Sequence, residues 1–151
     1  MAKILLKIIT PEKKVFEELV DSVTLPTQDG EITVLPGHIP LISALTSGDI
    51  VARADSHEIP FAVVGGFIEV DRNSLDEARD IETTVSILAD FAEHVGDISD
   101  TVIAEAEKRA AEIRAMKEHA TDVDFEHFEA ELERSLTRVK IADKWRKKKY
   151  K

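Results

Sequence analysis

The spacing of the apolar residues changes near residue 90, and this change constrains the fold more than any other feature of the sequence. Before it, short apolar runs and turn residues follow one another at intervals of about ten residues, a pattern typical of a β-sandwich or barrel. Most of the prolines and glycines lie between residues 11 and 66. After Gly96 the apolar residues recur at spacings of three and four, the period of an α-helix. The sequence therefore predicts a β + α protein, with an all-β half followed by a helical half.

The first half, residues 1–92, is predicted to form one β domain whose strand interiors are rich in β-branched residues. The sequence Gln28-Asp29-Gly30 predicts a hairpin turn, because glycine accepts a positive φ. Residues 71–84 are polar, and we expect an exposed excursion between two strands, with a helical turn at Leu75 to Arg79. The expected strands are Lys3–Ile9, Val23–Leu25, Glu31–Leu35, Ile39–Leu45, Ile50–Ala54, Ile59–Val64, Phe67–Val70 and Val85–Leu88.

Residues 97–142 are predicted to form an antiparallel hairpin of two helices. Asp97 is the expected cap of the first helix, and Asp122 or Asp124 that of the second, with the break near residues 119–122. A hairpin of this size buries little surface by itself and has to pack on something else. The predicted apolar faces are Ile98, Val102, Ala106, Ala110 and Ile113 on the first helix and Phe125, Phe128, Leu132, Leu136 and Val139 on the second.

The charge is unevenly distributed along the chain. The net charge is −10, yet residues 140–151 carry seven cations and one anion, Asp143. The acidic body disfavours binding to nucleic acid. The basic tail, residues 143–151, is compatible with a solvated, frayed end, with contact to an acidic partner, or with contact to a membrane surface through Trp145 and Tyr150. No apolar run approaches the roughly 18 residues of a membrane span.

No residue pattern indicates catalysis, a cofactor or a metal site. The chain has no cysteine, which excludes disulfides and thiolate chemistry. Its five histidines show no metal-ligand spacing. Gly65-Gly66 is followed by a strand-like run rather than a helix, so it predicts a tight turn and not a phosphate-binding loop. The chain is predicted not to be an enzyme.

The stretch from Leu25 to Leu41 holds two turn sequences, Asp29-Gly30 and Pro36-Gly37, which would present Glu31 and His38 near strand ends. One interpretation is that these residues serve only to form the turns, with the histidine side chain hydrogen-bonded to a backbone carbonyl. The other is a fixed surface that recognises a partner protein.

Ordered motifs in this half resemble the ε subunit of the rotary F-type ATP synthase, called δ in mitochondria. The resemblance covers residues 3–70 and 85–92 and is weaker in the helical half, where Asp122-Val123-Asp124-Phe125 agrees. The most specific motif is Leu35-Pro36-Gly37-His38-Ile39-Pro40-Leu41. The others are Thr10-Pro11-Glu12, Val23-Thr24-Leu25-Pro26-Thr27, Asp29-Gly30-Glu31-Ile32, Gly48-Asp49-Ile50, Gly65-Gly66-Phe67-Ile68-Glu69-Val70 and Leu88-Ala89-Asp90.

The resemblance implies a β-sandwich of about ten strands followed by a two-helix hairpin, in a non-catalytic subunit of the central stalk. It implies that the sandwich binds the gamma subunit and the c ring, with Glu31 facing the c ring and His38 near both. It also implies that the hairpin either folds against the sandwich or extends along gamma and restrains ATP hydrolysis. Basic residues of the second helix would then face the catalytic beta subunit, and the candidates are Arg134, Arg138, Lys140 and Lys144.

Family members that bind ATP carry an acid, an arginine and an alanine at the start of the first helix, where this chain has Ser99, Val102 and Ile103. We therefore expect no ATP binding of physiological relevance. Without a transit peptide, the expected location is the cytoplasmic face of the bacterial plasma membrane, as a peripheral protein without direct insertion. The alternative from another class is a free-standing adaptor or a small-ligand-binding β-sandwich.

Overall fold

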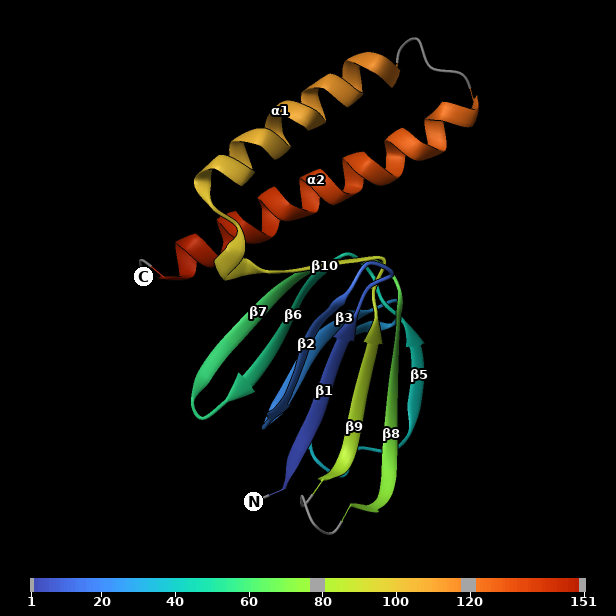
Figure 1. The fold of residues 1–151 in the computed structure, drawn as a ribbon, viewed down its shortest axis with the longest axis vertical. Coiled ribbons are helices and arrows are strands. Elements are labelled where there is room, and N and C mark those ends of the chain that lie inside the picture. The colour runs from blue at the N-terminus through green and yellow to red at the C-terminus, as the bar shows by residue number, and fades with distance from the viewer. Residues whose placement is uncertain (1, 77–80, 118–121, 150–151) are drawn as a thin grey trace. The chain divides into compact units, whose positions relative to one another are not determined.

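The computed structural model describes the chain except residues 1, 77–80, 118–121 and 150–151. Side chains are also not described for 73–76, 82, 117, 122–125 and 149. The chain forms two compact units, Met1–His94 and Val95–Lys151. The first unit consists of β-strands and the second of two helices (Figure 1).

The described part of the first unit holds ten strands in two five-stranded sheets, which confirms the predicted β-sandwich. One sheet has the order β2-β1-β9-β8-β5, and the other has the order β10-β7-β6-β3-β4. β1 and β9 pair in parallel, whereas the other neighbours are antiparallel. The strands are β1 (Lys3–Ile9), β2 (Lys14–Val20), β3 (Ser22–Thr27), β4 (Gly30–Val34), β5 (Leu41–Ala44), β6 (Gly48–Ala54), β7 (His57–Val64), β8 (Phe67–Asp76), β9 (Ile81–Leu88) and β10 (Phe91–His94).

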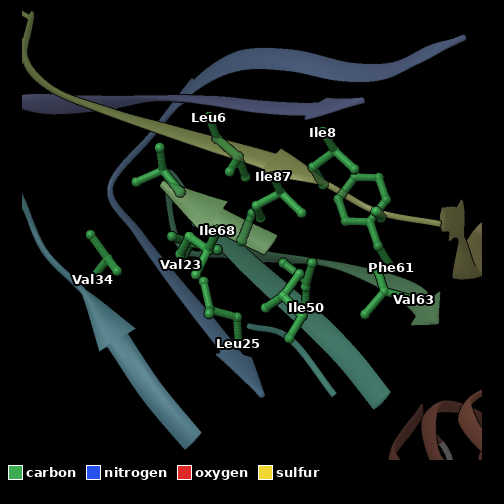
Figure 2. Close-up of a cluster of buried hydrophobic side chains, with 14 of the residues drawn as sticks. Leu6, Ile8, Val23, Leu25, Val34, Ile50, Phe61, Val63, Ile68 and Ile87 are labelled. Atoms are coloured by element: carbon green, nitrogen blue, oxygen red, sulfur yellow. The ribbon is translucent and has the colours of Figure 1, made fainter. Parts of the chain in front are cut away.

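The core of the sandwich forms from the inward side chains of both sheets (Figure 2). Along β1 the burial alternates strictly, so that Ile4, Leu6 and Ile8 are buried and their neighbours are half-buried. Phe61 of β7 is a large fully buried side chain, and its ring meets that of Phe16 edge-on at a centroid distance of 5.1 Å. Because this core uses residues of the first unit alone, the sandwich holds its own apolar interior.

The apolar pattern of the sequence does not predict β2 or β10. β2 is an edge strand that pairs only with β1 in the described structure, and three of its inner residues, Glu17, Glu18 and Leu19, are exposed. An edge strand carries charged side chains that protect it from pairing with other chains, so its apolar alternation is weak. β10 has only four residues, too few for a periodic signal.

The prediction of an excursion at residues 71–84 is wrong for the described residues. β8 continues through Asp76 and β9 begins at Ile81, and their pairing includes Asp71 with Thr84 and Arg72 with Thr83. Residues 71–76 and 81–84 therefore belong to a long β-hairpin. The helical turn expected at 75–79 is replaced by strand at Leu75 and Asp76, and its remainder lies outside the described residues.

The second unit contains a short 3-10 helix, Val95–Asp97, followed by α1 (Asp100–Lys117) and α2 (Asp122–Lys149). α1 is capped by Ser99 rather than by Asp97, because the Ser99 hydroxyl accepts the N–H of Val102 at 3.3 Å. The buried face of α1 comprises Ile103, Ala106, Ala110 and Ile113, so Ile103 takes the place predicted for Val102. The two helices run antiparallel, as predicted (Figure 1).

The inner face of α2 also differs from the prediction. Phe128, Leu132 and Val139 are half-buried, but Leu136 is 39% exposed, and Ser135 is the buried residue at this level. Spacings of four and three through 128, 132, 135 and 139 keep one side of the helix facing inward, and Leu136 falls outside that side. The break predicted at 119–122 falls mostly outside the described residues. The helix continues to Lys149, so residues 143–149 of the basic tail are helical.

Candidate partner-binding surfaces

Glu31 lies directly after the β3–β4 turn. Gln28 and Asp29 form the turn, and Glu31 pairs with Pro26 across the hairpin. The Thr27 hydroxyl donates to the Gly30 carbonyl at 2.6 Å and fixes the strand ends beside it. The Glu31 side chain is exposed, so its carboxylate is available to a partner.

His38 lies beyond the other end of β4, in the connection to β5. Its backbone N–H donates to the Leu35 carbonyl at 3.1 Å, and its ring Nδ1 lies 2.7 Å from the Ile39 carbonyl oxygen. Glu31 and His38 therefore occupy opposite ends of one strand, and the structure does not bring them together.

An apolar row that the sequence pattern did not predict lies on the outer face of the sheet β2-β1-β9-β8-β5. In the strand registers, Ile9 pairs with Leu88, Leu88 with Phe67 and Phe67 with Ala44, so the row crosses four neighbouring strands. Phe67 is 60% exposed and Leu88 is 55% exposed. These four residues, with Ile42 of β5, which is 74% exposed, are called the apolar row below.

A signal for this row is present in the sequence. Ile68 and Val70 share the core side of β8, so the period of two places Phe67 on the opposite side, towards solvent. The same alternation places Leu88 outside because Ile87 is buried. Large exposed apolar residues in adjacent strands are typical of a protein interface.

The four basic candidates on α2 lie on two sides of the helix. Arg134 and Arg138 are one pair four residues apart, and Lys140 and Lys144 are another. At 3.6 residues per turn the two pairs are about 120° apart around the axis. Arg134, Lys140 and Lys144 are exposed, while Arg138 is half-buried. The four residues therefore cannot all face one flat partner surface.

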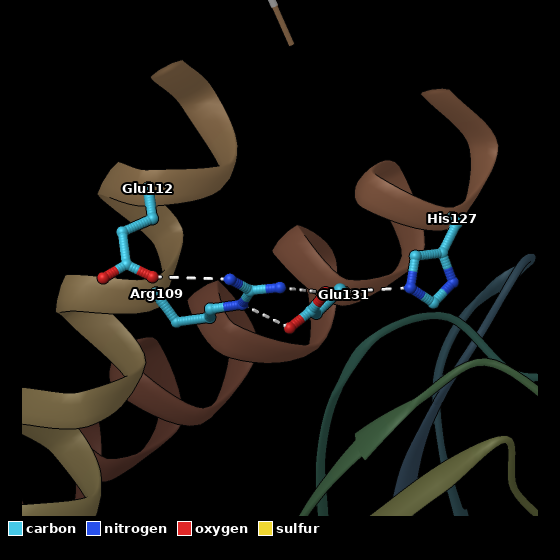
Figure 3. Close-up of polar contacts among 4 residues, drawn as sticks. All are labelled: Arg109, Glu112, His127 and Glu131. Carbon is cyan, nitrogen blue, oxygen red and sulfur yellow. Dashed lines mark hydrogen bonds and ion pairs between the residues drawn. The ribbon is translucent and has the colours of Figure 1, made fainter. Parts of the chain in front are cut away.

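A cross-helix ion pair joins α1 to α2 (Figure 3). Arg109 donates from Nε to Glu131 Oε1 at 2.6 Å and from Nη2 to Oε2 at 3.1 Å, a two-point contact. Glu112 accepts from Arg109 at 3.3 Å, and the His127 ring lies 4.0 Å from Glu131. The hydrogen bond from Arg109 holds the pKa of Glu131 below its usual value, against a smaller opposing effect of burial. The contact links the two helices across the hairpin.

No group of three or more potential metal-ligating residues occurs among the residues that the structure describes. At the start of α1, two of the side chains at the positions of the ATP motif are already engaged, and so is the neighbouring Asp100. Ser99 caps the helix, Ile103 is buried, and Asp100 forms an ion pair with Arg146 of α2.

Residues 3–95 match the family model described as the ATP synthase delta/epsilon chain β-sandwich domain, which is more than half of the chain. The chain belongs to the ATP synthase delta/epsilon chain family. The ATP synthase epsilon chain of Syntrophobacter fumaroxidans is 39% identical over 94% of this chain and 97% of its own length. That of Dehalococcoides mccartyi is 38% identical over 97% of both chains. As an epsilon-type chain, the molecule is a non-catalytic subunit of the ATP synthase complex.

The fold is shared with a chain in the cryo-EM structure of the Euglena gracilis mitochondrial ATP synthase, which contains OSCP, F1 and the c ring. The TM-score is 0.63 at 24% identity, covering 88% of this chain and 77% of that one. Over its described residues, neither helix of the epsilon-type chain combines the length and apolar content that a membrane span requires.

Proposed function

We propose that this subunit links the gamma subunit to the c ring of a proton-translocating ATP synthase, and that its helical hairpin restrains ATP hydrolysis. In this proposal residues 1–92 dock on the stalk, residues 97–142 regulate, and residues 143–151 form a basic tail. We place the subunit at the cytoplasmic face of the bacterial plasma membrane, where it binds peripherally.

The apolar row supports this docking role and is the observation that carries it. Phe67 and Leu88 are large side chains that face solvent side by side, and exposing them costs free energy that a bound partner would recover. Burial of apolar surface is worth about 25 cal/mol per Å², so two such side chains can contribute a few kcal/mol to binding. A stalk subunit that turns with its partners needs a permanent contact of this kind. We assign the row to the gamma subunit, and the end of the sandwich at Glu31 to the c ring.

The hairpin has features that suit a movable regulator. Arg109 and Glu131 tie its two helices together, so they can move as one body. The exposed cations of α2 provide a surface for acidic segments of the catalytic beta subunit. An attraction between exposed charges is screened by salt, so ionic strength should weaken the restraint.

Binding to the purified gamma subunit tests the docking role. The substitutions Phe67→Ser and Leu88→Ser together are expected to weaken binding by at least tenfold, because they remove the apolar contact. Leu19→Ser is the matched control, since Leu19 is 43% exposed on the same sheet but pairs with Leu5, away from the row. Calorimetry or surface plasmon resonance gives the affinities. Equal affinities for the wild type and the double variant would refute the assignment of the row to gamma.

We also infer that ATP is not a ligand of this hairpin. Val102 offers no charge to a phosphate, and the Asp100 carboxylate already pairs with Arg146. Titration calorimetry with ATP is expected to show no binding below millimolar concentration; a sub-millimolar affinity would overturn this inference.

A further inference from the structure

The connection between β4 and β5 begins with a turn whose backbone is held at each end. The turn comprises Leu35, Pro36, Gly37 and His38, and it is closed by the hydrogen bond from the His38 N–H to the Leu35 carbonyl at 3.1 Å. Pro36 has the fixed φ that suits the second position, and Gly37 at the third position has φ +84°. This combination defines a type II turn, in which the third residue requires a positive φ.

The closing hydrogen bond does not use the N–H of Gly37. Thr83 supplies the acceptor, with its Oγ1 at 2.8 Å from the Gly37 nitrogen, although the two residues are 46 positions apart. Thr83 is fully buried, at 0% exposure, near the beginning of β9. Figure 1 shows this connection passing beside the lower ends of β8 and β9.

Thr83 is itself held from both sides. Its strand pairs with β1, where Thr83 stands opposite Ile4, and with β8, where it stands opposite Arg72. The hydroxyl therefore sits on the middle of three paired strands, in the long part of the β8–β9 hairpin. Ending that hairpin at the Val70–Val85 pair would remove this anchor.

The turn and the residue that follows it present two groups to a partner. The Ile39 side chain is 71% exposed and projects an apolar surface. The His38 Nδ1 lies 2.7 Å from the Ile39 carbonyl oxygen, and a carbonyl only accepts, so Nδ1 carries the hydrogen. In the neutral ring the other nitrogen, Nε2, is then an acceptor available to a donor on the partner.

We propose that Thr83 is a positioning residue for this turn: its hydroxyl fixes the orientation in which Ile39 and His38 meet the stalk. The proposal rests on the proposed function, because it takes the turn to be a contact with the gamma subunit. The physical basis is preorganisation, since a turn fixed before binding loses less conformational freedom when the complex forms. One net hydrogen bond is worth about 0.5–1.5 kcal/mol, which corresponds to a roughly two- to tenfold change in affinity.

The test compares Thr83→Val with Thr83→Ser in the full chain. Valine keeps the volume but removes the acceptor, whereas serine keeps the hydroxyl. We expect Thr83→Val to accelerate amide hydrogen exchange at Gly37 and to weaken binding to the purified gamma subunit about two- to tenfold. Thr83→Ser is expected to restore both. Thr24→Val is the matched control, because it removes a hydroxyl bonded to Thr33 at 2.9 Å in the other sheet and leaves the turn intact.

The outcomes separate the positioning role from the proposed function. Unchanged gamma binding by Thr83→Val, with faster exchange at Gly37, would overturn the positioning role and leave the function standing. Failure of the wild-type chain to bind gamma would instead refute the proposed function. If Thr83→Val does not fold, Pro36→Ala loosens the same turn from outside the core and should weaken binding similarly; wild-type affinity for that variant would overturn the positioning role.

Discussion

At the scale of single residues, Gly66 shows how closely the backbone of the sandwich packs. Its φ is +109°, and a Cβ built there would lie 2.1 Å from the Leu88 carbonyl oxygen and 2.8 Å from the Ala89 Cα. Those neighbours are backbone atoms, which cannot move aside as the end of a side chain can. The approach holds the start of β8 against the end of β9, the place where Phe67 and Leu88 stand side by side.

Gly66→Ala is therefore expected to destabilise the chain by about 3 kcal/mol, combining a strained φ with a steric clash. Gly48→Ala is the control: the nearest atom to its Cβ is Pro26 Cγ at 3.3 Å, so we expect a change within about 1 kcal/mol. Urea denaturation measures both. Equal effects of the two substitutions would show that the close approach at Gly66 is not required for stability.

At the scale of elements, the contact between α1 and α2 includes a carboxylate that titrates. Arg109 holds the pKa of Glu131 below the ordinary glutamate value of 4.5. A group whose folded pKa is lowered stabilises the folded state fully above its unfolded pKa, and this contribution disappears as the pH falls through the folded pKa. The groups around it are Arg109 and Glu112 on α1 and His127 and Arg134 on α2.

We expect Glu131→Gln to melt at a lower temperature than the wild type at pH 7, because the ion pair is lost. The difference should shrink as the pH drops below 4.5 and vanish once the wild-type carboxylate is protonated. Thermal melts followed by circular dichroism at several pH values provide the measurement. The exposed Glu126→Gln on the same helix is the control and should show no such trend. A difference between wild type and Glu131→Gln that stays constant with pH would contradict the role of the ion pair.

The elements that the sequence predicted correctly are those with a strong period. β1 alternates strictly, and α1 repeats at three and four, so both were assigned from spacing alone. β2 was not predicted because an edge strand lacks a neighbouring strand along one edge and carries exposed charged side chains. In β2 the glutamates Glu17 and Glu18 interrupt the apolar alternation that would have marked it as a strand. Residues 71–76 look like a loop in the sequence, yet they pair with β9 because backbone hydrogen bonds do not depend on side-chain polarity.

The candidate site was predictable only in part. Turn chemistry placed Glu31 and His38 at strand ends, since Gly30 and Gly37 both have a positive φ. The partner of the His38 turn is Thr83, 46 residues from Gly37, and no local pattern specifies a contact over that separation. The apolar row likewise depends on the order of the strands in the sheet, which alternation within one strand does not reveal.

At the scale of the whole molecule, the two units differ in how each is stabilised. This difference suits the docking role that we propose for the sandwich and the regulatory role that we propose for the hairpin. The sandwich has a closed core and rigid outer surfaces, which suits a permanent contact with a rotating partner. Among the described residues the hairpin has fewer fully buried side chains, and a partly exposed ion pair joins its helices. We therefore propose that alternative packings of the hairpin differ by only a few kcal/mol. In the regulation that we propose, the hairpin switches when a partner binds one of these packings better than the other.

In the regulation that we propose, the position of the basic pairs on α2 decides which of them meets the catalytic beta subunit. The side of α2 that faces α1 contains Leu132, Ser135 and Val139, and it ends at Arg146, which pairs with Asp100. Lys140 and Lys144 lie about 130° from this side, whereas Arg134 and Arg138 lie about 110° from it and on the flank of Glu131. We propose the lysine pair as the contact for an acidic partner surface, because both lysines are exposed whereas Arg138 is half-buried beside Glu131.

In the assembled ATP synthase, Lys140→Gln with Lys144→Gln is expected to raise the rate of ATP hydrolysis on the order of two- to fivefold, because exposed ion pairs contribute roughly 0.2–1 kcal/mol each. Arg134→Gln with Arg138→Gln removes the same charge at the same spacing and should raise the rate less. Added salt should bring the wild-type rate towards that of the lysine variant, since screening weakens the same contact. Equal rates for the two double variants would show that the restraint follows the total charge of α2 and not one side of it, and wild-type rates for both would remove these residues from the regulatory surface.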